Sequence, residues 1–206
     1  MSEAPTWDRI ASRYDLAARV FGRSYPAVRR ALSRDLAGRR RALELASGTG
    51  QFTSAMAQAV ESVVATDVSI EMVERLRAGV LAQGVENVSV RRMSAYDIDA
   101  DDQSFDAVVC ANALHVMERP RDALREMHRV VSAEGMIVAP TFLHGASAAT
   151  RLLSRTLSAL SPFVAHTRFD LPRLVGMFRT ADFEVIHSET FAGLFPIGYV
   201  VARRTP

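Results

Sequence analysis

The chain has 206 residues, of which 49% are hydrophobic and 23% are charged, a composition typical of one globular domain rather than of a disordered chain. All 25 basic residues are arginine, which excludes Schiff-base lysine chemistry, a phosphate-loop lysine and a Tyr/Lys dehydrogenase pair. The formal net charge of +2 is too small to indicate a nucleic-acid partner.

Residues 29–41 are locally basic. We interpret them as a solvated helix face and loop, with an anionic partner such as a membrane surface as the alternative. The single cysteine, Cys110, excludes an internal disulfide and a multi-cysteine metal site and is expected to be buried. The five histidines lack the spacing of metal ligands. The first residues carry charges where a signal peptide is apolar, and no apolar run is long enough to span a membrane, so a soluble, cytoplasmic protein is expected.

In chain order, short apolar runs typical of β-strands alternate with helix-like segments. The predicted strands cover 42–45, 62–67, 88–93, 105–111, 136–142, 183–191 and 198–204. The predicted helices cover 53–60, 69–80, 120–131 and 171–181. In the third helix the apolar residues recur at helical spacing, Pro120 suits its first turn, and Gly135 is expected beyond its end.

This alternation predicts a doubly wound α/β fold, with a seven-stranded, mostly parallel sheet covered by helices on both faces. The connection between the last two strands is too short for a parallel crossover, so they should form a C-terminal antiparallel hairpin. We expect one domain with four parts: an N-terminal helical lid (1–41), a cofactor-binding core (42–142), an insertion roofing the acceptor site (143–170), and the last helix with the hairpin (171–206).

The stretch "ALELASGTG" (42–50) combines a strand-end acid, Glu44, with a turn of small residues. Such a turn lets backbone amides approach a ligand at the carboxyl edge of a parallel sheet. Asp67 ends the next strand, where a carboxylate can accept both hydroxyls of a ribose. The pair therefore indicates a nucleoside-containing ligand.

A dinucleotide would require a third glycine where this chain has Thr53, and its pyrophosphate would be repelled by Glu44. A cofactor with a charged amino-acid tail, such as S-adenosylmethionine, would instead bring its ammonium to Glu44, directly or through water. An ordinary strand-end charge at Glu44, or a helix-capping role for Asp67, is the structural alternative.

The whole pattern resembles the class I S-adenosylmethionine-dependent methyltransferases. The resemblance covers about residues 5–204 and depends on "WDRIASRYD", "ALELASGTG", "ATDVSIEMVERLR", the block from "SFDAVVCANALHV" to "MIVAPTF", and the C-terminal hairpin. Ala46 replaces the usual first glycine of the loop. The acid that usually follows the third strand is missing, so Ser94 or Asp97 would substitute for it, and we favour Ser94 with backbone contacts at its two neighbours.

The resemblance implies a site in which the loop backbone lines the cofactor, Asp67 holds the ribose and an N-terminal aromatic closes over it. The implied cofactor-binding residues are Tyr14, Glu44, Ala46, Gly48, Gly50, Asp67, Val68, Met72, Ser94, Ala95, Tyr96, Ala111 and Asn112. No metal is implied.

Methyl transfer is an in-line displacement in which alignment and exclusion of water do most of the work. His115 follows the fourth strand where the methyl group should emerge, so it is the candidate catalytic base, with a structural histidine as the alternative. His144 and His166 are weaker candidates for the acceptor pocket. "NALH" after the fourth strand lacks the Pro-Pro-aromatic element typical of nucleobase amino-methyltransferases.

The apolar insertion predicts a hydrophobic acceptor, which would be a small aromatic, quinone-like or natural-product molecule. A phospholipid amine is the second possibility, with peripheral membrane contact, and an inactive S-adenosylmethionine-binding protein is the third. The chain is expected to act as a monomer or homodimer.

Overall fold

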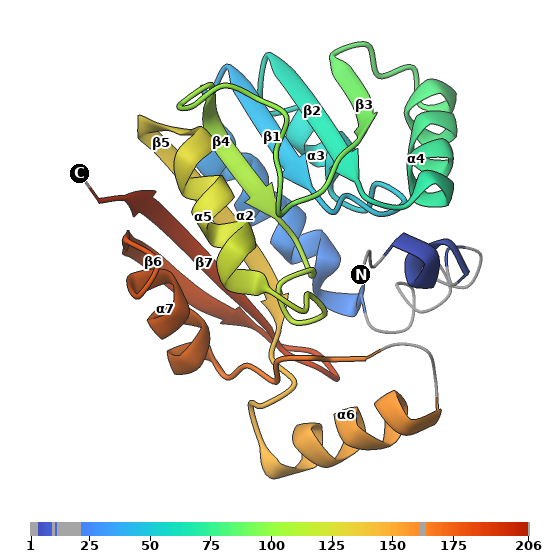
Figure 1. The fold of residues 1–206 in the computed structure, drawn as a ribbon, viewed down its shortest axis with the longest axis vertical. Coiled ribbons are helices and arrows are strands. Elements are labelled where there is room, and N and C mark those ends of the chain that lie inside the picture. The colour runs from blue at the N-terminus through green and yellow to red at the C-terminus, as the bar shows by residue number, and fades with distance from the viewer. Residues whose placement is uncertain (1–3, 10, 12–21, 161–163, 206) are drawn as a thin grey trace.

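The computed structural model describes residues 4–9, 11, 22–160 and 164–205 (Figure 1). They form a three-layer α/β arrangement around a seven-stranded sheet with the order β3-β2-β1-β4-β5-β7-β6. The strands are β1 (Arg41–Leu45), β2 (Ser62–Asp67), β3 (Val88–Arg92), β4 (Phe105–Cys110), β5 (Val131–Phe142), β6 (Phe183–Phe191) and β7 (Ile197–Arg204). The predicted fold class is therefore confirmed.

The first five strands pair in parallel, and β7 lies antiparallel between β5 and β6. Four of the five residues of β1 are buried, because helices cover both faces of the sheet. The strand order reverses between β1 and β4, which pair side by side. Their carboxyl ends therefore border the crevice in which open α/β sheets bind ligands.

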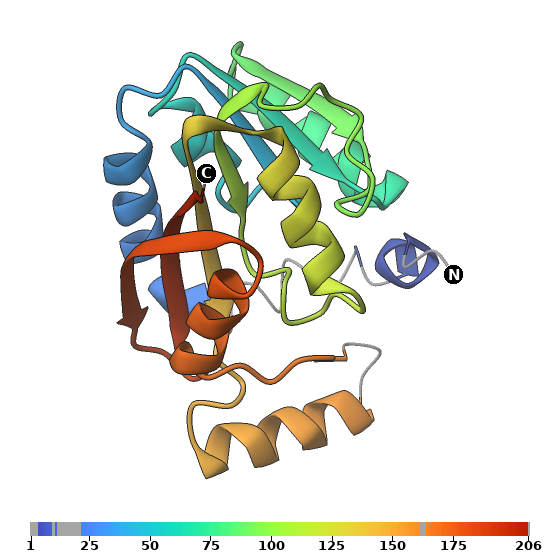
Figure 2. The ribbon, with the colours of Figure 1, turned by 60° about the vertical axis from the view of Figure 1, so that its left-hand side comes forward.

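From Gly22 onward, the described residues form seven helical elements. These are η1 (Gly22–Ser24), α2 (Tyr25–Leu36), α3 (Thr53–Ala57), α4 (Ile70–Ala82), α5 (Pro120–Val130), α6 (Ala148–Leu160) and α7 (Leu171–Arg179). Residues of α2, α3 and α4 share one buried cluster with the sheet, and residues of α5 and α7 share the other. The turned view shows these two layers on opposite faces (Figure 2). No described helix has the length and apolar character needed to cross a membrane.

The boundary between α5 and β5 corrects one prediction. The expected helix 120–131 ends at Val130, and the chain enters β5 at Val131, so Gly135 lies inside the strand rather than before it. A Cβ at Gly135 would lie 2.6 Å from Val131 Cγ2 and 3.0 Å from the Ser132 carbonyl oxygen. The glycine thus permits a tight irregularity in β5, where the register with β4 shifts.

Residues 143–170 leave the sheet after β5 and return before α7. Within this segment α6 extends from the body of the protein (Figure 1). The base of the segment is held by two backbone hydrogen bonds, Gly145 N to Phe169 O at 2.7 Å and Leu143 N to Pro196 O at 2.7 Å. A Cβ at Gly145 would lie 2.5 Å from the Arg168 carbonyl oxygen. The outgoing and returning segments of the insertion can therefore approach each other only because residue 145 is a glycine.

Candidate cofactor and acceptor site

The loop after β1 adopts three left-handed residues: Ala46 (φ 52°), Gly48 (φ 55°) and Gly50 (φ 89°). Glycine takes this conformation without strain, whereas a Cβ costs about 1–2 kcal/mol. Ala46 therefore occupies a position with glycine geometry, and its replacement of the usual glycine is more than a change of size. A Cβ at Gly50 would also lie 2.6 Å from Leu76 Cδ1, but that atom ends a flexible side chain, so the left-handed φ is the stronger reason for a glycine there.

Asp67 fastens this loop to the end of β2. Its Oδ2 accepts a hydrogen bond from Gly48 N at 2.9 Å and its Oδ1 accepts one from Ser69 N at 2.9 Å. Burial raises the pKa of Asp67, and the backbone hydrogen bonds offset part of that rise. Ser69 itself caps α4, because its hydroxyl accepts from Met72 N at 3.2 Å. The carboxylate keeps further lone pairs for the two hydroxyls of a ribose.

Glu44 lies beneath the loop with 1% of its surface exposed. Thr53 Oγ1 donates a hydrogen bond to Glu44 Oε2 at 2.5 Å. Burial raises the pKa of Glu44 to about 7, hydrogen bonds from Thr53 and Ser47 lower it, and the nearby Asp67 adds to the rise. A buried carboxylate with such a pKa would be stabilised in its charged form by an approaching cation.

An N-terminal helical turn lies against the same edge of the sheet. Asp8 Oδ1 accepts a hydrogen bond from the Ser69 hydroxyl and lies 3.5 Å from Glu71 N. The charge of Asp8 also contributes to the raised pKa of Asp67. Neither Asp8 nor Thr53 was predicted from the sequence, where Thr53 counted only as a missing glycine. Tyr14 lies outside the described residues.

The segment after β3 forms a tight turn in which Ser94 Oγ accepts from Tyr96 N at 3.1 Å. Ser94, Ala95 and Tyr96 are half-buried, whereas Asp97, the alternative acid, is exposed. The Arg119 guanidinium lies 4.5 Å from the centre of the Tyr96 ring. Of the two residues expected on the adenine, Val68 is half-buried and Met72 is buried.

Asn112 follows β4 in a left-handed conformation (φ 52°), which asparagine tolerates better than most residues. Its Nδ2 donates to Tyr25 Oη at 3.1 Å. Its Oδ1 is buried and meets no hydrogen-bond donor within the described part of the chain. Burial raises the pKa of Tyr25 to about 12, so the phenol keeps its proton. Ala111, the other residue expected here, is half-buried.

Beyond Asn112 lies a group of five rings, Tyr25, His115, Phe142, His144 and Phe195, which we call the ring cluster. The ring centres are 4.9 Å apart for His115 and His144, 4.4 Å for His144 and Phe195, 5.7 Å for His115 and Phe142, and 6.3 Å for Tyr25 and Phe142. These spacings are those of packed aromatic pairs. The insertion covers the cluster, since Thr167 N donates to His115 O at 3.1 Å.

Both imidazoles of the ring cluster are neutral at pH 7. Burial, with His144 as a second cause, lowers the pKa of His115 well below its usual value, and burial lowers the pKa of His144 to about 4. The buried, neutral imidazole of His115 is thus a weaker base than a solvent-exposed histidine. His166, the third candidate for the acceptor pocket, is exposed and lies outside the cluster.

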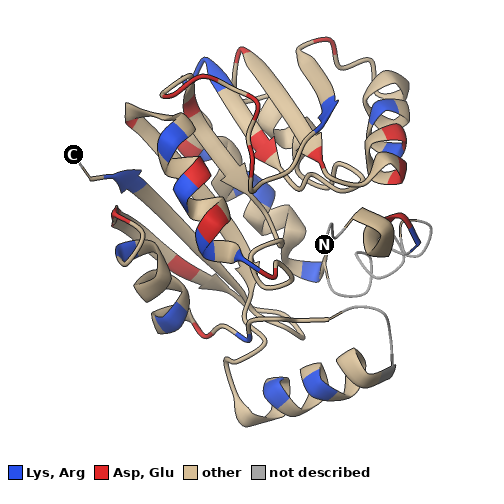
Figure 3. Ribbon diagram, in the orientation of Figure 1, with Lys and Arg blue, Asp and Glu red and all other residues tan. Residues whose placement is uncertain are grey.

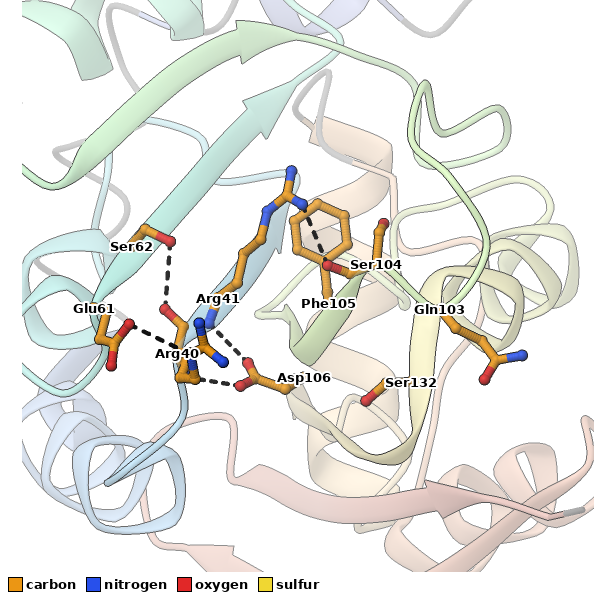
Figure 4. A pocket seen from close by; sticks show the side chains of 9 residues that line it. All are labelled: Arg40, Arg41, Glu61, Ser62, Gln103, Ser104, Phe105, Asp106 and Ser132. Atoms are coloured by element: carbon orange, nitrogen blue, oxygen red, sulfur yellow. Dashed lines mark hydrogen bonds and ion pairs between the residues drawn. The ribbon is translucent and has the colours of Figure 1, made fainter.

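A separate pocket of about 360 Å³ lies among the amino ends of β1, β2 and β4 (Figure 4). Its charged groups are already matched: Asp106 accepts from Arg40 N at 2.7 Å and Arg41 N at 2.9 Å, and Arg40 lies 3.6 Å from Glu61. It is at the opposite end of the strands from Glu44 and Asp67. No group of three potential metal ligands occurs among the residues that the structure describes.

A protein-family model described as "Methyltransferase domain" matches residues 43–139. Demethylmenaquinone methyltransferase of Clavibacter sepedonicus is 39% identical over 98 residues, which are 48% of this chain and 39% of that protein. Ubiquinone/menaquinone biosynthesis C-methyltransferase UbiE of Pseudomonas aeruginosa is 29% identical over 188 residues, covering 88% of this chain and 70% of that protein. The chain spans only about two fifths of the length of the curated relatives that it matches first.

The fold is also that of solved S-adenosylmethionine-dependent methyltransferases. A solved structure from Thermotoga maritima, described as a possible histamine N-methyltransferase, superposes with a TM-score of 0.76 at 20% identity, over 98% of this chain and 99% of that one. At this identity the likeness concerns the fold alone.

Proposed function

The chain belongs to the class I S-adenosylmethionine-dependent methyltransferases, and on this premise we propose that it methylates a ring carbon of a small, hydroxylated aromatic acceptor of the quinol type. The ring cluster is the observation that carries the choice of acceptor. The two quinone-related enzymes among the similar proteins support the same class.

The residues around the β1 loop fit S-adenosylmethionine. Asp67 would accept the ribose hydroxyls, Gly48 and Gly50 would line the cofactor with backbone, and Glu44 would face its ammonium. The buried Oδ1 of Asn112 supplies a second acceptor for that ammonium. When bound, the cofactor supplies an electrophilic methyl group on a sulfonium that is already a good leaving group.

The ring cluster supports a planar, uncharged acceptor. Its five rings are buried and packed together, which makes its surroundings largely apolar. Its two imidazoles are neutral, so they would not hold an anion by ion pairing. A quinol ring is electron-rich, and loss of a hydroxyl proton increases the electron density on the adjacent carbon. His115 is neutral and can accept that proton, although its lowered pKa makes it a weak base.

The test is formation of S-adenosylhomocysteine, with mass spectrometry of the product, over three acceptors. These are a short-chain naphthohydroquinone with a free ring position, its fully ring-methylated form, and phosphatidylethanolamine vesicles. We expect carbon methylation of the first and no turnover of the second. Methylated lipid amine, or cofactor binding with no turnover of any acceptor, would overturn the proposal in favour of the two alternatives.

A further inference from the structure

Helix α6 presents a face that the rest of the described structure does not cover. Ala148, Arg151, Leu152 and Arg155, which we call the outer face of α6, are exposed, and Leu152 keeps 67% of its surface accessible. On the opposite side of the helix, Leu153 and Leu157 pack against the core cluster that contains Phe195. The helix is therefore fixed to the protein by one side while the other side remains available.

The outer face of α6 carries two positive charges, and no acidic residue in this part of the insertion balances them. Residues 143–169 contain no acidic residue. Helix α6 contains two arginines one helical turn apart and no acidic residue along its length (Figure 3). Arg151 Nη1 donates to Gly145 O at 3.3 Å, which joins the helix to the base of the insertion.

Other apolar side chains are exposed on the segments that adjoin α6. Val164, on the returning segment, is 43% exposed, and Leu194, in the turn between β6 and β7, is 55% exposed. The hydrogen bond from Leu143 N to Pro196 O ties that turn to the base of the insertion. The same turn brings Phe195 onto His144 with ring centres 4.4 Å apart. The exposed apolar and basic groups therefore lie next to the ring cluster.

We propose that the outer face of α6 docks the protein on an anionic lipid bilayer. Leu152 would enter the interface between head groups and acyl chains while Arg151 and Arg155 contact anionic head groups, as in interfacial amphipathic helices. A second copy of the chain fits this face less well. A two-fold symmetric contact would place Arg151 and Arg155 of one copy against the same arginines of the other, and these like charges would repel. This inference does not depend on which acceptor is methylated.

The experiment is co-sedimentation of the full chain with vesicles of phosphatidylcholine containing about one third phosphatidylglycerol, compared with pure phosphatidylcholine. We expect binding to the anionic vesicles, which weakens in high salt. The double variant Arg151→Gln/Arg155→Gln should weaken it about 25-fold, at roughly fivefold per arginine. Leu152→Ser should also weaken it. S-adenosylmethionine affinity should be unchanged for both variants, and thermal unfolding should be unchanged for Leu152→Ser, whereas the double variant also loses the hydrogen bond from Arg151 to Gly145.

The matched control is Arg121→Gln/Arg125→Gln, which removes two exposed arginines at the same spacing from α5. It should bind vesicles like the unmodified protein. No binding to anionic vesicles, or an equal loss in the control, would overturn the proposal. A dimer in light scattering that Leu152→Ser dissociates would overturn it in favour of a second copy. None of these outcomes bears on the acceptor assay, so the two proposals fail separately.

Discussion

Replacing Glu44 with glutamine should stabilise the protein in the absence of cofactor, and should do so only above acidic pH. The pKa of Glu44 rises from 4.5 to about 7 in the folded protein. Below pH 4.5 both folded and unfolded chains hold the proton, so the folded protein bears no penalty. Between the two values the unfolded chain loses the proton first, and stability falls as pH rises until the folded carboxyl also ionises.

The size of the effect follows from the shift. A difference of about 2.5 units corresponds to roughly 3 kcal/mol, at about 1.4 kcal/mol per unit. Glutamine keeps an oxygen that can accept from Thr53, but its amide N–H groups lack an assigned partner, which costs about 1–2 kcal/mol at any pH. We therefore expect a net gain of about 1–2 kcal/mol near pH 8 and a small loss near pH 4.5.

Urea unfolding of the wild type and Glu44→Gln at both pH values measures this difference. Subtracting the two proteins removes the titration of all other groups, and about 3 kcal/mol should remain between the two conditions. Glu61→Gln is the control, because Glu61 is 70% exposed and should give no such difference. If the difference in unfolding free energy between wild type and Glu44→Gln is the same at both pH values, the raised pKa of Glu44 is refuted.

The same substitution should weaken S-adenosylmethionine binding by about 10- to 100-fold, since a charge-assisted hydrogen bond contributes about 1.5–3 kcal/mol. In the wild type, affinity should rise with pH as Glu44 ionises near pH 7. An acid with only a structural role would change stability without changing calorimetric affinity.

Three other substitutions test the site. Asp67→Ala should weaken calorimetric S-adenosylmethionine affinity at least tenfold and also lower stability, because it releases Gly48 N and Ser69 N; unchanged affinity would remove Asp67 from the site. Ala46→Gly should raise the unfolding free energy by about 0.5–1 kcal/mol, since relief of the left-handed strain exceeds the added chain entropy; a lower value would mean that Ala46 is unstrained. His115→Ala should lower turnover about 10²–10⁴-fold on a quinol acceptor, while the rise in kcat/KM near pH 7 remains because it belongs to Glu44; full turnover would remove the base.

Most strand positions could be predicted because buried parallel strands appear in the sequence as short apolar runs. The start of β5 could not, because Val131 fits the apolar spacing of the preceding helix and residues 132–135 lack the apolar run of a buried strand. Helix α5 therefore ends at Val130, one residue earlier than the spacing of its apolar residues predicted.

The positions of the two candidate acids, Glu44 and Asp67, near the ends of β1 and β2 could be predicted from the sequence. The hydrogen-bond partners of the site residues could not be predicted, because folding brings them together from distant positions in the chain. Thr53 lies 9 residues from Glu44, Asp8 lies 61 residues from Ser69, and Tyr25 lies 87 residues from Asn112. Of the ring cluster, only His115 and His144 were candidates from the sequence. Tyr25, Phe142 and Phe195 were missed because they come from α2, the end of β5 and the β6–β7 turn.

The position of β7 between β5 and β6 has a consequence for synthesis of the protein. The strand nearest the C-terminus lies inside the sheet, and its Val201 pairs with Val138 on one side and His187 on the other. While the ribosome still holds residues 197–204, β5 keeps an unpaired apolar edge and β6 has no neighbour. The nascent chain can therefore pair β1 to β5 early, but β5 and β6 remain exposed to edge-to-edge aggregation until residues 197–204 emerge.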